Sequence, residues 1–283
     1  MATRAEVKEA ASNLDHGGIV PFMTNTAVQK SISDMVGEEN TTRFVSSIIS
    51  AVKANPDLGE CSNSSILSAA LLGESLNLPP SPQLGFYYFV PYKNKGVPEA
   101  QFQLGWKGYI QLAERSGQYR KIIASEVREG ELDKYNPITE EFELTPIMDD
   151  TERQKANVIG YYAMFELNNG FRKEIYWSKE KMESHAKQYS AGYRNDLKKE
   201  QSFTFWSKDF DSMAKKTMLR QLISKWGIMS IQMQKAYQGD MAVIREDGSY
   251  DYVDNQETAE EIIDVAQTEI GENQNTIPFE VEE

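Results

Sequence analysis

Residues that hold metal ions or form covalent links are scarce in this chain of 283 residues. Its one cysteine, Cys61, excludes a disulfide within the chain, and its two histidines are His16 and His185. A structural zinc site takes about four cysteine or histidine ligands, so these three residues are too few for one. His185 lies in a polar segment, where we expect a satisfied surface histidine rather than the base of a hydrolase.

Signatures of nucleotide-driven, secreted and membrane proteins are also missing. No GxxxxGK[ST] phosphate loop occurs, which argues against an ATP-driven strand-exchange motor, and no GxGxxG segment or nucleophile elbow is present. No run of about 18 apolar residues occurs, so no membrane span is expected. Because the first residues lack a signal-peptide pattern and cysteine is rare, the sequence predicts a cytoplasmic protein.

Clustered carboxylates keep one enzymatic alternative open, a metal-dependent nuclease. Glu140, Glu141 and Glu143 are close in sequence, but their surroundings indicate a turn and an edge strand. Asp209 and Asp211 precede the basic part of a predicted helix, where they fit partners of its dipole. We therefore expect no metal, no cofactor and no enzymatic activity.

Negative charge exceeds positive charge, but it is concentrated at one end. The formal net charge of −13 taken alone argues against nucleic acid as a partner. Residues 245–283 carry 13 acidic residues and one basic residue, which leaves 29 basic and 30 acidic residues in 1–244. The body of the chain is nearly neutral, and its acidic end is typical of an interaction tail.

The hydrophobic pattern predicts an α+β protein with three parts. These are a flexible N-terminal arm (1–25), a mixed core of β-hairpins and helices (26–240), and an acidic tail or small partner-binding segment (241–283). A connection that contains Gly192 is expected to be flexible. Helices are predicted over 40–54, 63–76, 107–115, 178–190 and 203–226. Strands are predicted over 86–92, 100–104, 119–127, 158–167 and 171–177, with turns at 93–96 and 168–170 that form two hairpins.

Two windows of the core are both basic and aromatic. Residues 93–128 contain seven basic and three acidic residues, and residues 198–226 have the same balance. Cations neutralise phosphates without reading sequence, and aromatic faces stack on any base. Such windows are typical of a groove for single-stranded nucleic acid.

The predicted helix over 203–226 has two faces of different character. Lys216 and Arg220, four residues apart, lie on a face that is open either to phosphates or to solvent alone. A second face is more typical of core than of a platform for stacked bases, and it carries Trp206, Phe210, Met213 and Thr217. Composition alone leaves a nucleic-acid groove and a solvated surface both open.

Three segments resemble the RecT family of phage and prophage annealing proteins. Residues 71–92 are similar to the family's helix, its break before proline and its first strand. Residues 101–117 follow the pattern FQ-x-GYKG-x-x-x-LA-x-RSG, with Trp106 where tyrosine is usual, and residues 206–222 follow W-x-x-DF-x-x-MAKKT-x-x-R-x-L. The likeness fades before residue 25 and after residue 240 or so.

The resemblance implies an ATP-independent recombinase that binds single-stranded DNA, forms rings or helical filaments and pairs complementary strands. It implies a compact β-β-β-α type core, with a basic groove along the oligomer that holds one strand extended. Gly105 and Gly108 of the second motif are expected to allow close approach of the backbone. The motifs assign phosphate contacts to Lys107, Arg115, Lys215, Lys216 and Arg220, and the groove wall to Gln101, Gln103 and Trp106. The basic windows add Lys121, Lys198 and Lys199.

The acidic tail has three interpretations. It can recruit a partner, which the family likeness suggests is a phage exonuclease or the host single-strand binding protein, it can screen the groove, or it can act as a solubilising segment. A cluster of Ile262, Ile263 and Val265 fits a short helix or a docking segment within it. Three alternatives to an annealing protein stay open: a passive single-stranded DNA-binding protein, the nuclease, and an adaptor that binds only proteins through this tail.

Overall fold

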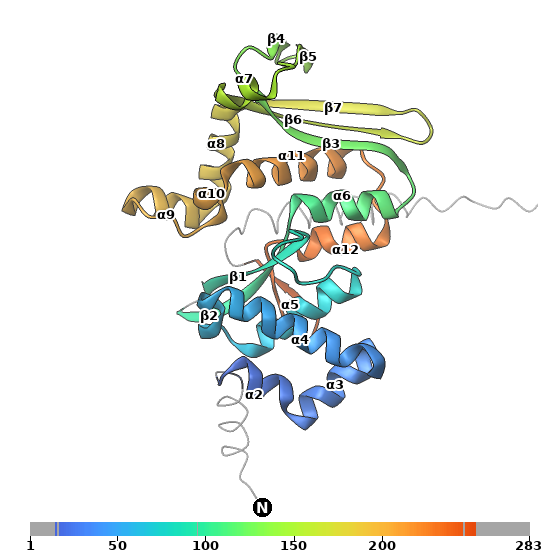
Figure 1. Cartoon of the computed structure of the whole chain (residues 1–283), viewed down its shortest axis with the longest axis vertical. Coiled ribbons are helices and arrows are strands. Elements are labelled where there is room, and N and C mark those ends of the chain that lie inside the picture. Colours follow the sequence, from blue (N-terminus) through green and yellow to red (C-terminus); the bar gives the residue numbers. More distant parts are fainter. Residues whose placement is uncertain (1–14, 16, 95, 246, 253–283) are drawn as a thin grey trace, which may run out of the picture.

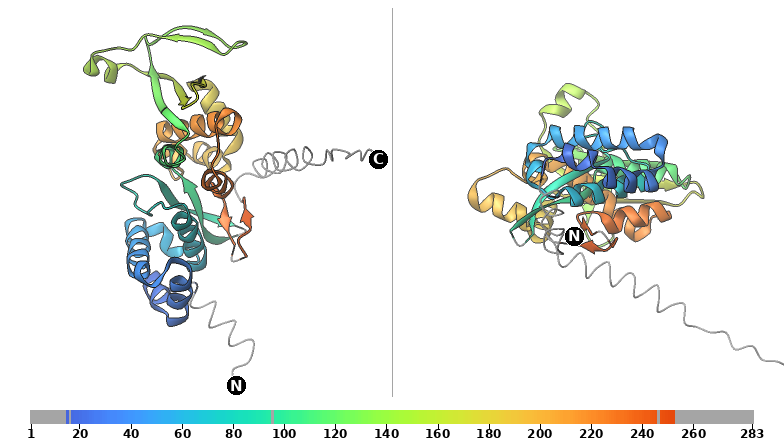
Figure 2. Two further views of the ribbon diagram at one scale, coloured as in Figure 1. Left: turned by 90° about the vertical axis from the view of Figure 1, so that its right-hand side faces the viewer. Right: turned by 90° about the horizontal axis from the view of Figure 1, so that it is seen from below.

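The protein is an elongated stack of layers in the computed structural model, which describes residues 15, 17–94, 96–245 and 247–252 (Figure 1). A layer of helices lies at one end, a hairpin with its covering helices in the middle, and a three-stranded sheet at the other end (Figures 1 and 2). The mixture of helices and small antiparallel sheets confirms the predicted α+β class. None of the helices in these ranges has the length and apolar character needed to cross a bilayer.

The N-terminal layer confirms two predicted helices and adds two more. The helices predicted over 40–54 and 63–76 form with bounds shifted by one or two residues. Ser62 caps the second of them by accepting a hydrogen bond from the N–H of Ser65. In chain order this layer comprises α2 (Ile19–Thr24), α3 (Thr26–Val36), α4 (Glu38–Ala54), η1 (Pro56–Glu60) and α5 (Asn63–Ser75).

Helix α2 corrects the flexible arm predicted over 1–25. Phe22 and Met23 of α2 are buried in the core, and the side chain of Asn25 caps α3 by accepting hydrogen bonds from two backbone N–H groups. A six-residue helix is too short for its apolar residues to show a period, so no helical pattern could be recognised there. Residues 1–14 and 16 lie outside the described residues.

The first hairpin, β1 (Tyr87–Asn94) and β2 (Val97–Leu104), is confirmed at the predicted place. One face packs against α5, and on it the rings of Tyr87 and Phe102 stack with centroids 4.8 Å apart. Gln101 and Gln103 lie on the opposite face. Helix α6 (Trp106–Arg115) starts directly after β2.

The two predicted glycine contacts hold at the start of α6. A Cβ on Gly105 would lie 2.2 Å from the carbonyl oxygen of Gly85, and a Cβ on Gly108 would lie 2.2 Å from that of Phe86. Both distances are far inside van der Waals contact, so only glycine allows α6 to pack directly on this backbone.

The larger sheet has the strand order β3-β6-β7, and each pair of neighbouring strands is antiparallel. Its hairpin turns at Asn168-Asn169-Gly170 as predicted, with Gly170 at a φ of 87°. Helix α11 packs against the sheet on one side and against α6 on the other. The strands are β3 (Tyr119–Arg128), β6 (Val158–Leu167) and β7 (Arg172–Ser178). Between β3 and β6 the chain forms β4 (Leu132–Asn136), β5 (Glu141–Leu144) and α7 (Asp150–Lys155).

The segment before α11 corrects two predictions. Gly192 lies inside a helix rather than in a flexible connection, and the helix predicted over 203–226 is broken at Asp209. Asp209 accepts a hydrogen bond from the N–H of Ser212 at 3.1 Å and so begins α11, while Asp211 lies in its first turn. The helices are α8 (Lys179–Tyr189), α9 (Ala191–Lys199), α10 (Phe205–Lys208), α11 (Phe210–Trp226) and α12 (Ile231–Gly239).

The folded body extends past residue 240, where the sequence predicted the tail to begin. Ala242 and Val243 are buried, and Ala242 bridges Phe102 of β2. Strands β8 (Val243–Ile244) and β9 (Tyr250–Asp251) then pair with each other. Residues 253–283 lie outside the described residues, and with them the predicted cluster of Ile262, Ile263 and Val265.

Candidate nucleic-acid interface

The two basic and aromatic windows, separate in sequence, meet at Trp106. The Nζ atom of Lys215 in α11 lies 4.9 Å from the centroid of the Trp106 ring, and that of Lys107 lies 5.8 Å from it. Lys215 also donates a hydrogen bond of 2.8 Å to Glu126 of β3. Partial burial raises the pKa of Glu126, but Lys215 outweighs this effect and holds it below its usual value.

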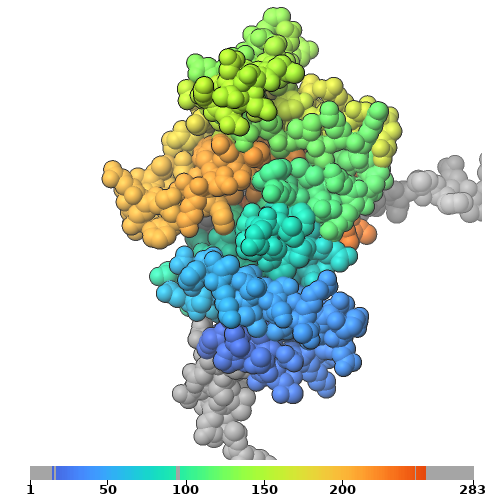
Figure 3. Space-filling model, in the orientation of Figure 1, coloured from blue at the N-terminus to red at the C-terminus, as the bar shows by residue number. Residues whose placement is uncertain are grey.

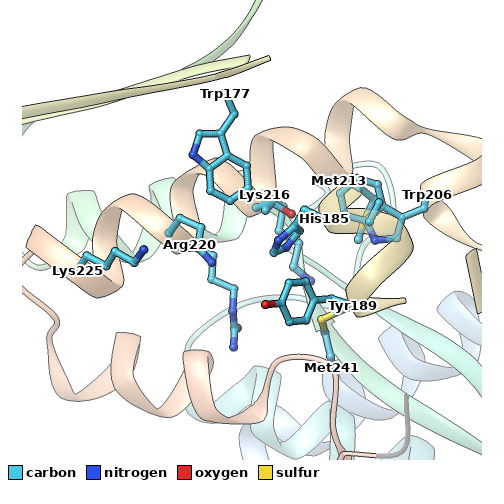
Figure 4. A pocket seen from close by; sticks show the side chains of 12 residues that line it. Trp177, His185, Tyr189, Trp206, Met213, Lys216, Arg220, Lys225 and Met241 are labelled. Atoms are coloured by element: carbon cyan, nitrogen blue, oxygen red, sulfur yellow. The ribbon is translucent and has the colours of Figure 1, made fainter. Parts of the chain in front are cut away.

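An upper hollow of about 240 Å³ lies between β7, α8 and α11 (Figure 4). Aromatic rings form one part of its wall, with His185 between Trp177 and Tyr189. Three side chains of α11 bring positive charge to it, and they are Lys216, Arg220 and Lys225. The hollow thus offers flat apolar faces beside cations.

A lower hollow of about 320 Å³ adjoins the upper one, because Trp206, Met213 and Met241 line both. Its walls come from both windows: Lys93, Gln101 and Gln103 from the first, and Phe203, Phe205, Trp206, Lys208 and Met213 from the second. The face of Trp206, Phe210, Met213 and Thr217 is confirmed as largely buried core, and three of these four side chains also border the upper hollow.

Gln101 and Gln103 lie where the sequence placed a groove wall. Both are buried on β2 and line the lower hollow. The Nε2 of Gln101 is buried and has no hydrogen-bond partner among the described residues. A buried amide donor without a partner is unusual and favours a site that receives an acceptor from elsewhere.

Lys216 and Arg220 are not on an open face, which corrects the prediction made for this side of α11. Lys216 is only 3% exposed and donates a hydrogen bond of 2.7 Å to Asp240. Arg220 donates to the other oxygen of Asp240 at 3.0 Å and lies over the ring of Tyr237 at 3.8 Å. The reason is that the face of α11 that carries Lys216 and Arg220 packs against Asp240 and Tyr237 instead of facing solvent.

Asp240 links four elements through this cluster. The carboxylate is fully buried and also accepts hydrogen bonds from the N–H of Leu104 at 2.9 Å and the hydroxyl of Tyr109 at 3.2 Å. Burial lowers the pKa of Lys216 against the pull of Asp240. Burial also acts to lower the pKa of Arg220, but Tyr109 and Asp240 raise it above its usual value. Two cations therefore share one carboxylate beside the upper hollow.

The other residues predicted to contact DNA lie against the end of α5, on the exposed surfaces of α6 and β3, and at the end of α9. Arg115 donates hydrogen bonds of 2.9 Å to the carbonyl oxygens of Leu76 and Asn77, so it closes the C-terminal end of α5. Lys107 and Lys121 are exposed on α6 and β3. Lys198 and Lys199 are exposed at the end of α9, away from the Trp106 contacts. For all of them, contact with DNA stays a prediction.

Two of the three glutamates in the predicted carboxylate cluster form ion pairs. Glu140 pairs with Lys173, and Glu143 pairs with Lys134. Within the part of the chain that the structure describes, no group of three or more histidine, cysteine, aspartate or glutamate residues is placed to hold a metal ion.

His185 corrects the expectation of a surface histidine. It is half-buried in the upper hollow, its ring centroid 5.4 Å from that of Trp177 and 4.5 Å from that of Tyr189. Burial, helped by the charges of Arg220 and Lys181, lowers its pKa from 6.5 to about 4. The burial of His185 could not be predicted from the polar sequence of its helix, because its aromatic partners come from β7 and from one turn further along α8.

His185 predicts a specific pH dependence of stability. The unfolded chain binds the imidazole proton near pH 6.5 and the folded chain near pH 4, so the free energy of unfolding falls as the pH drops through this window. The loss is at most about 3 kcal/mol. We expect the free energy of unfolding, measured with urea, to change less between pH 6.5 and pH 5 in His185→Phe than in the wild type. Carboxylates contribute little to the change in this range. If the free energy of unfolding depends on pH equally in the two proteins, the imidazole of His185 is not buried in its neutral form.

Four residues of the site had no signal in the sequence. Trp177 and Tyr189 belonged to a strand and a polar helix, and Asp240 and Met241 were assigned to the boundary of the tail. Only the cations of α11 show that the carboxylate of Asp240 points inward.

Comparison with known proteins covers most of the chain. The sequence profile of the RecT family matches residues 42–273. The "Uncharacterized protein YqaK" of Bacillus subtilis (strain 168) is 40% identical over 266 residues, which cover 92% of this chain and 85% of that protein. "Protein RecT" of Escherichia coli (strain K12) is 26% identical over 272 residues, which cover 90% of this chain and 95% of that protein.

Proposed function

Because this chain belongs to the RecT family, we propose that it is an ATP-independent protein of phage homologous recombination that binds single-stranded DNA and anneals it to a complementary strand. DNA binding, recombination and single-strand annealing are the activities that the family supports. In the proposal, oligomers of the chain hold one strand extended along the two adjoining hollows.

One observation supports a location for the proposed DNA binding on the molecule. The lower hollow is lined from both basic and aromatic windows, although 69 residues separate these windows in the sequence. A surface built from Lys93, Lys208, Phe205 and Trp206 combines exposed cations with aromatic rings. That combination suits a strand of any sequence, because phosphates meet the cations and bases meet the rings.

The Asp240 cluster supports the upper hollow as part of the same path. Lys216 and Arg220 bring two positive charges to one carboxylate, so an excess positive charge lies beside the hollow. A phosphate near this charge would be stabilised more strongly than in water, because the surroundings are apolar. Lys216 and Arg220 then act on DNA through this field and through the position they give α11.

The proposed mechanism needs no bond chemistry. Cations reduce the repulsion between two strands, and neighbouring subunits present many nucleotides in one row, so that pairing becomes effectively intramolecular. Base stacking, on the order of 1.4 kcal/mol per step, then drives duplex formation. A phage exonuclease or a host single-strand binding protein is the partner we propose for the acidic end of the chain.

The test of this function is annealing of two complementary labelled oligonucleotides without ATP. We expect the wild type to accelerate pairing and to bind a single strand with an affinity that falls steeply with salt. Replacing three exposed lysines of the hollows (Lys93→Ala, Lys208→Ala and Lys225→Ala) should reduce the slope of log affinity against log salt by about 2, at about 0.7 for each phosphate that is no longer neutralised.

A matched variant separates this effect from a change in net charge. Lys30→Ala, Lys53→Ala and Lys155→Ala remove three exposed lysines outside both hollows and should leave the slope unchanged. If the wild type binds a strand and never accelerates pairing, the chain is a passive single-stranded DNA-binding protein. Loss of labelled DNA with Mg²⁺ or Mn²⁺ would instead indicate a nuclease.

A further inference from the structure

The segment between β3 and β6 forms an acidic projection, here called the acidic lobe (residues 129–157, with β4, β5 and α7). It contains nine acidic and three basic residues. It projects at the end of the molecule opposite the N-terminal helices (Figures 1 and 2). This charge repels phosphates, so DNA binding does not explain the lobe.

Contacts within the lobe leave much of its negative charge facing outward. Arg153 and Lys134 each pair with one carboxylate of the lobe, Glu131 and Glu143 respectively. Exposed carboxylates that form no ion pair among the described residues remain at the β4–β5 hairpin and around α7, and they include Glu141, Asp150 and Glu152.

The lobe also exposes apolar side chains. Ile138 is 91% exposed and Met148 is 87% exposed, and these are the two most exposed large apolar side chains in the described ranges. Both lie in the loops of a lobe that is otherwise strongly charged. Apolar tips inside a field of one sign are typical of a surface that meets a protein of the opposite charge.

A surface of matching character lies on the same chain at α9 and the segment that follows it, here called the basic edge (residues 194–203). Lys198 and Lys199 are exposed there, beside Leu197 at 46% and Phe203 at 67% exposure. Of the two carboxylates in the edge, Asp196 is buried and Glu200 is exposed, against three basic residues, Arg194, Lys198 and Lys199. Asp196 accepts hydrogen bonds from Phe203 N–H, Thr204 N–H, Thr204 hydroxyl and Ser207 hydroxyl.

We propose that the acidic lobe of one copy of this chain docks on the basic edge of a second copy. The inference rests on the proposed assembly of the chain into oligomers and names the surfaces that make it. The lobe and the edge occupy different parts of the outline of the molecule, at the top and at the left of Figure 3. The contact is therefore between unlike surfaces, and it repeats from copy to copy as in a ring or filament.

This contact gives Lys198 and Lys199 a protein partner in place of the phosphates predicted from sequence. The ammonium groups would face carboxylates around Asp150 and Glu152, while Leu197 and Phe203 cover Met148 and Ile138. The lobe then lies against protein, and the hollows at Trp206 stay open to a strand.

Charge reversal tests the contact on the full chain by sedimentation velocity without DNA. One variant carries Lys198→Glu and Lys199→Glu, so both of its surfaces are acidic. The other carries Asp150→Lys and Glu152→Lys, so the α7 part of its lobe becomes basic, like its edge. Each alone should associate roughly tenfold or more weakly than wild type, because like charges then face each other. An equimolar mixture should regain the wild-type mass, because every lobe again finds an edge of opposite charge.

The control variant carries Lys30→Glu and Lys53→Glu, the same change of charge on α3 and α4, and should sediment as wild type. Wild-type mass for either reversed variant alone, or a mixture of folded variants that stays dissociated, overturns the proposal. If the wild type anneals DNA and the charge-reversed variants keep the wild-type mass, the proposed interface is wrong and the proposed function stands. If the mixture regains assembly and the wild type does not anneal DNA, the interface stands and the proposed function is wrong.

Discussion

Replacing Asp240 by asparagine is expected to lower the free energy of unfolding by about 3–5 kcal/mol, because it leaves buried cations without their carboxylate. Lys216 and Arg220 each lose an ion pair with Asp240, and neither reaches bulk water, since their side chains are 4% and 12% exposed. In the variant, one amide oxygen is the acceptor that remains for both the N–H of Leu104 and the hydroxyl of Tyr109. Urea unfolding at constant pH measures the change.

Two further variants make this result specific. Asp34→Asn removes an exposed carboxylate of α3 and should change stability by less than about 0.5 kcal/mol. Adding Lys216→Met to Asp240→Asn should recover part of the loss, because one unpaired buried charge is removed. If Asp240→Asn is as mild as Asp34→Asn, the carboxylate is not the buried partner of both cations.

Gly108→Ala is expected to lower the free energy of unfolding by about 3 kcal/mol, at the upper end of what overpacking costs. The added Cβ would lie 2.2 Å from the carbonyl oxygen of Phe86 and 2.8 Å from a methyl group of Leu104. The oxygen belongs to the backbone next to β1, so α6 must move as a unit to make room. Thermal or urea unfolding reads out the loss.

The matched change is Gly59→Ala in η1, where a new Cβ meets nothing within 4 Å. Alanine costs less conformational entropy there, so this variant should be neutral or more stable by up to about 1 kcal/mol. Opposite signs at the two positions are the expected outcome. A neutral Gly108→Ala would show that α6 does not pack on residues 85 and 86 at this distance.

Local signals explain which elements could be predicted. Helices α4 and α5 and both hairpins could be predicted because the apolar spacing and turn residues that indicate them lie within a few residues of each other. The break at Asp209 was missed because capping and continuing a helix use similar residues. Asp196, whose side chain accepts hydrogen bonds from the backbone at 203 and 204, holds these residues out of the helix, so that α10 starts only at Phe205.

The candidate site was only partly predictable for the same reason. Trp106 and Gln103 were found through the motif, and their neighbourhood with Lys215 or Phe205 follows from packing alone. The prediction for Lys216 was wrong because its partner lies 24 residues further on, at the last residue of the predicted core, next to the tail. A basic residue in a pattern signals charge, and its partner decides whether that charge is offered to a ligand or used in the core.

The position of Asp240 in the chain also bears on biosynthesis. Its carboxylate joins the N–H of Leu104, 136 residues earlier, and the strand of Ala242 closes on Phe102. During translation, a ribosome that has released only the first 226 residues has made both buried cations and not their anion. Contacts of such long sequence separation form slowly. The core of this protein can therefore close only after Asp240 has been made, and until then the nascent chain leaves β2, α6 and α11 without the residue that joins them.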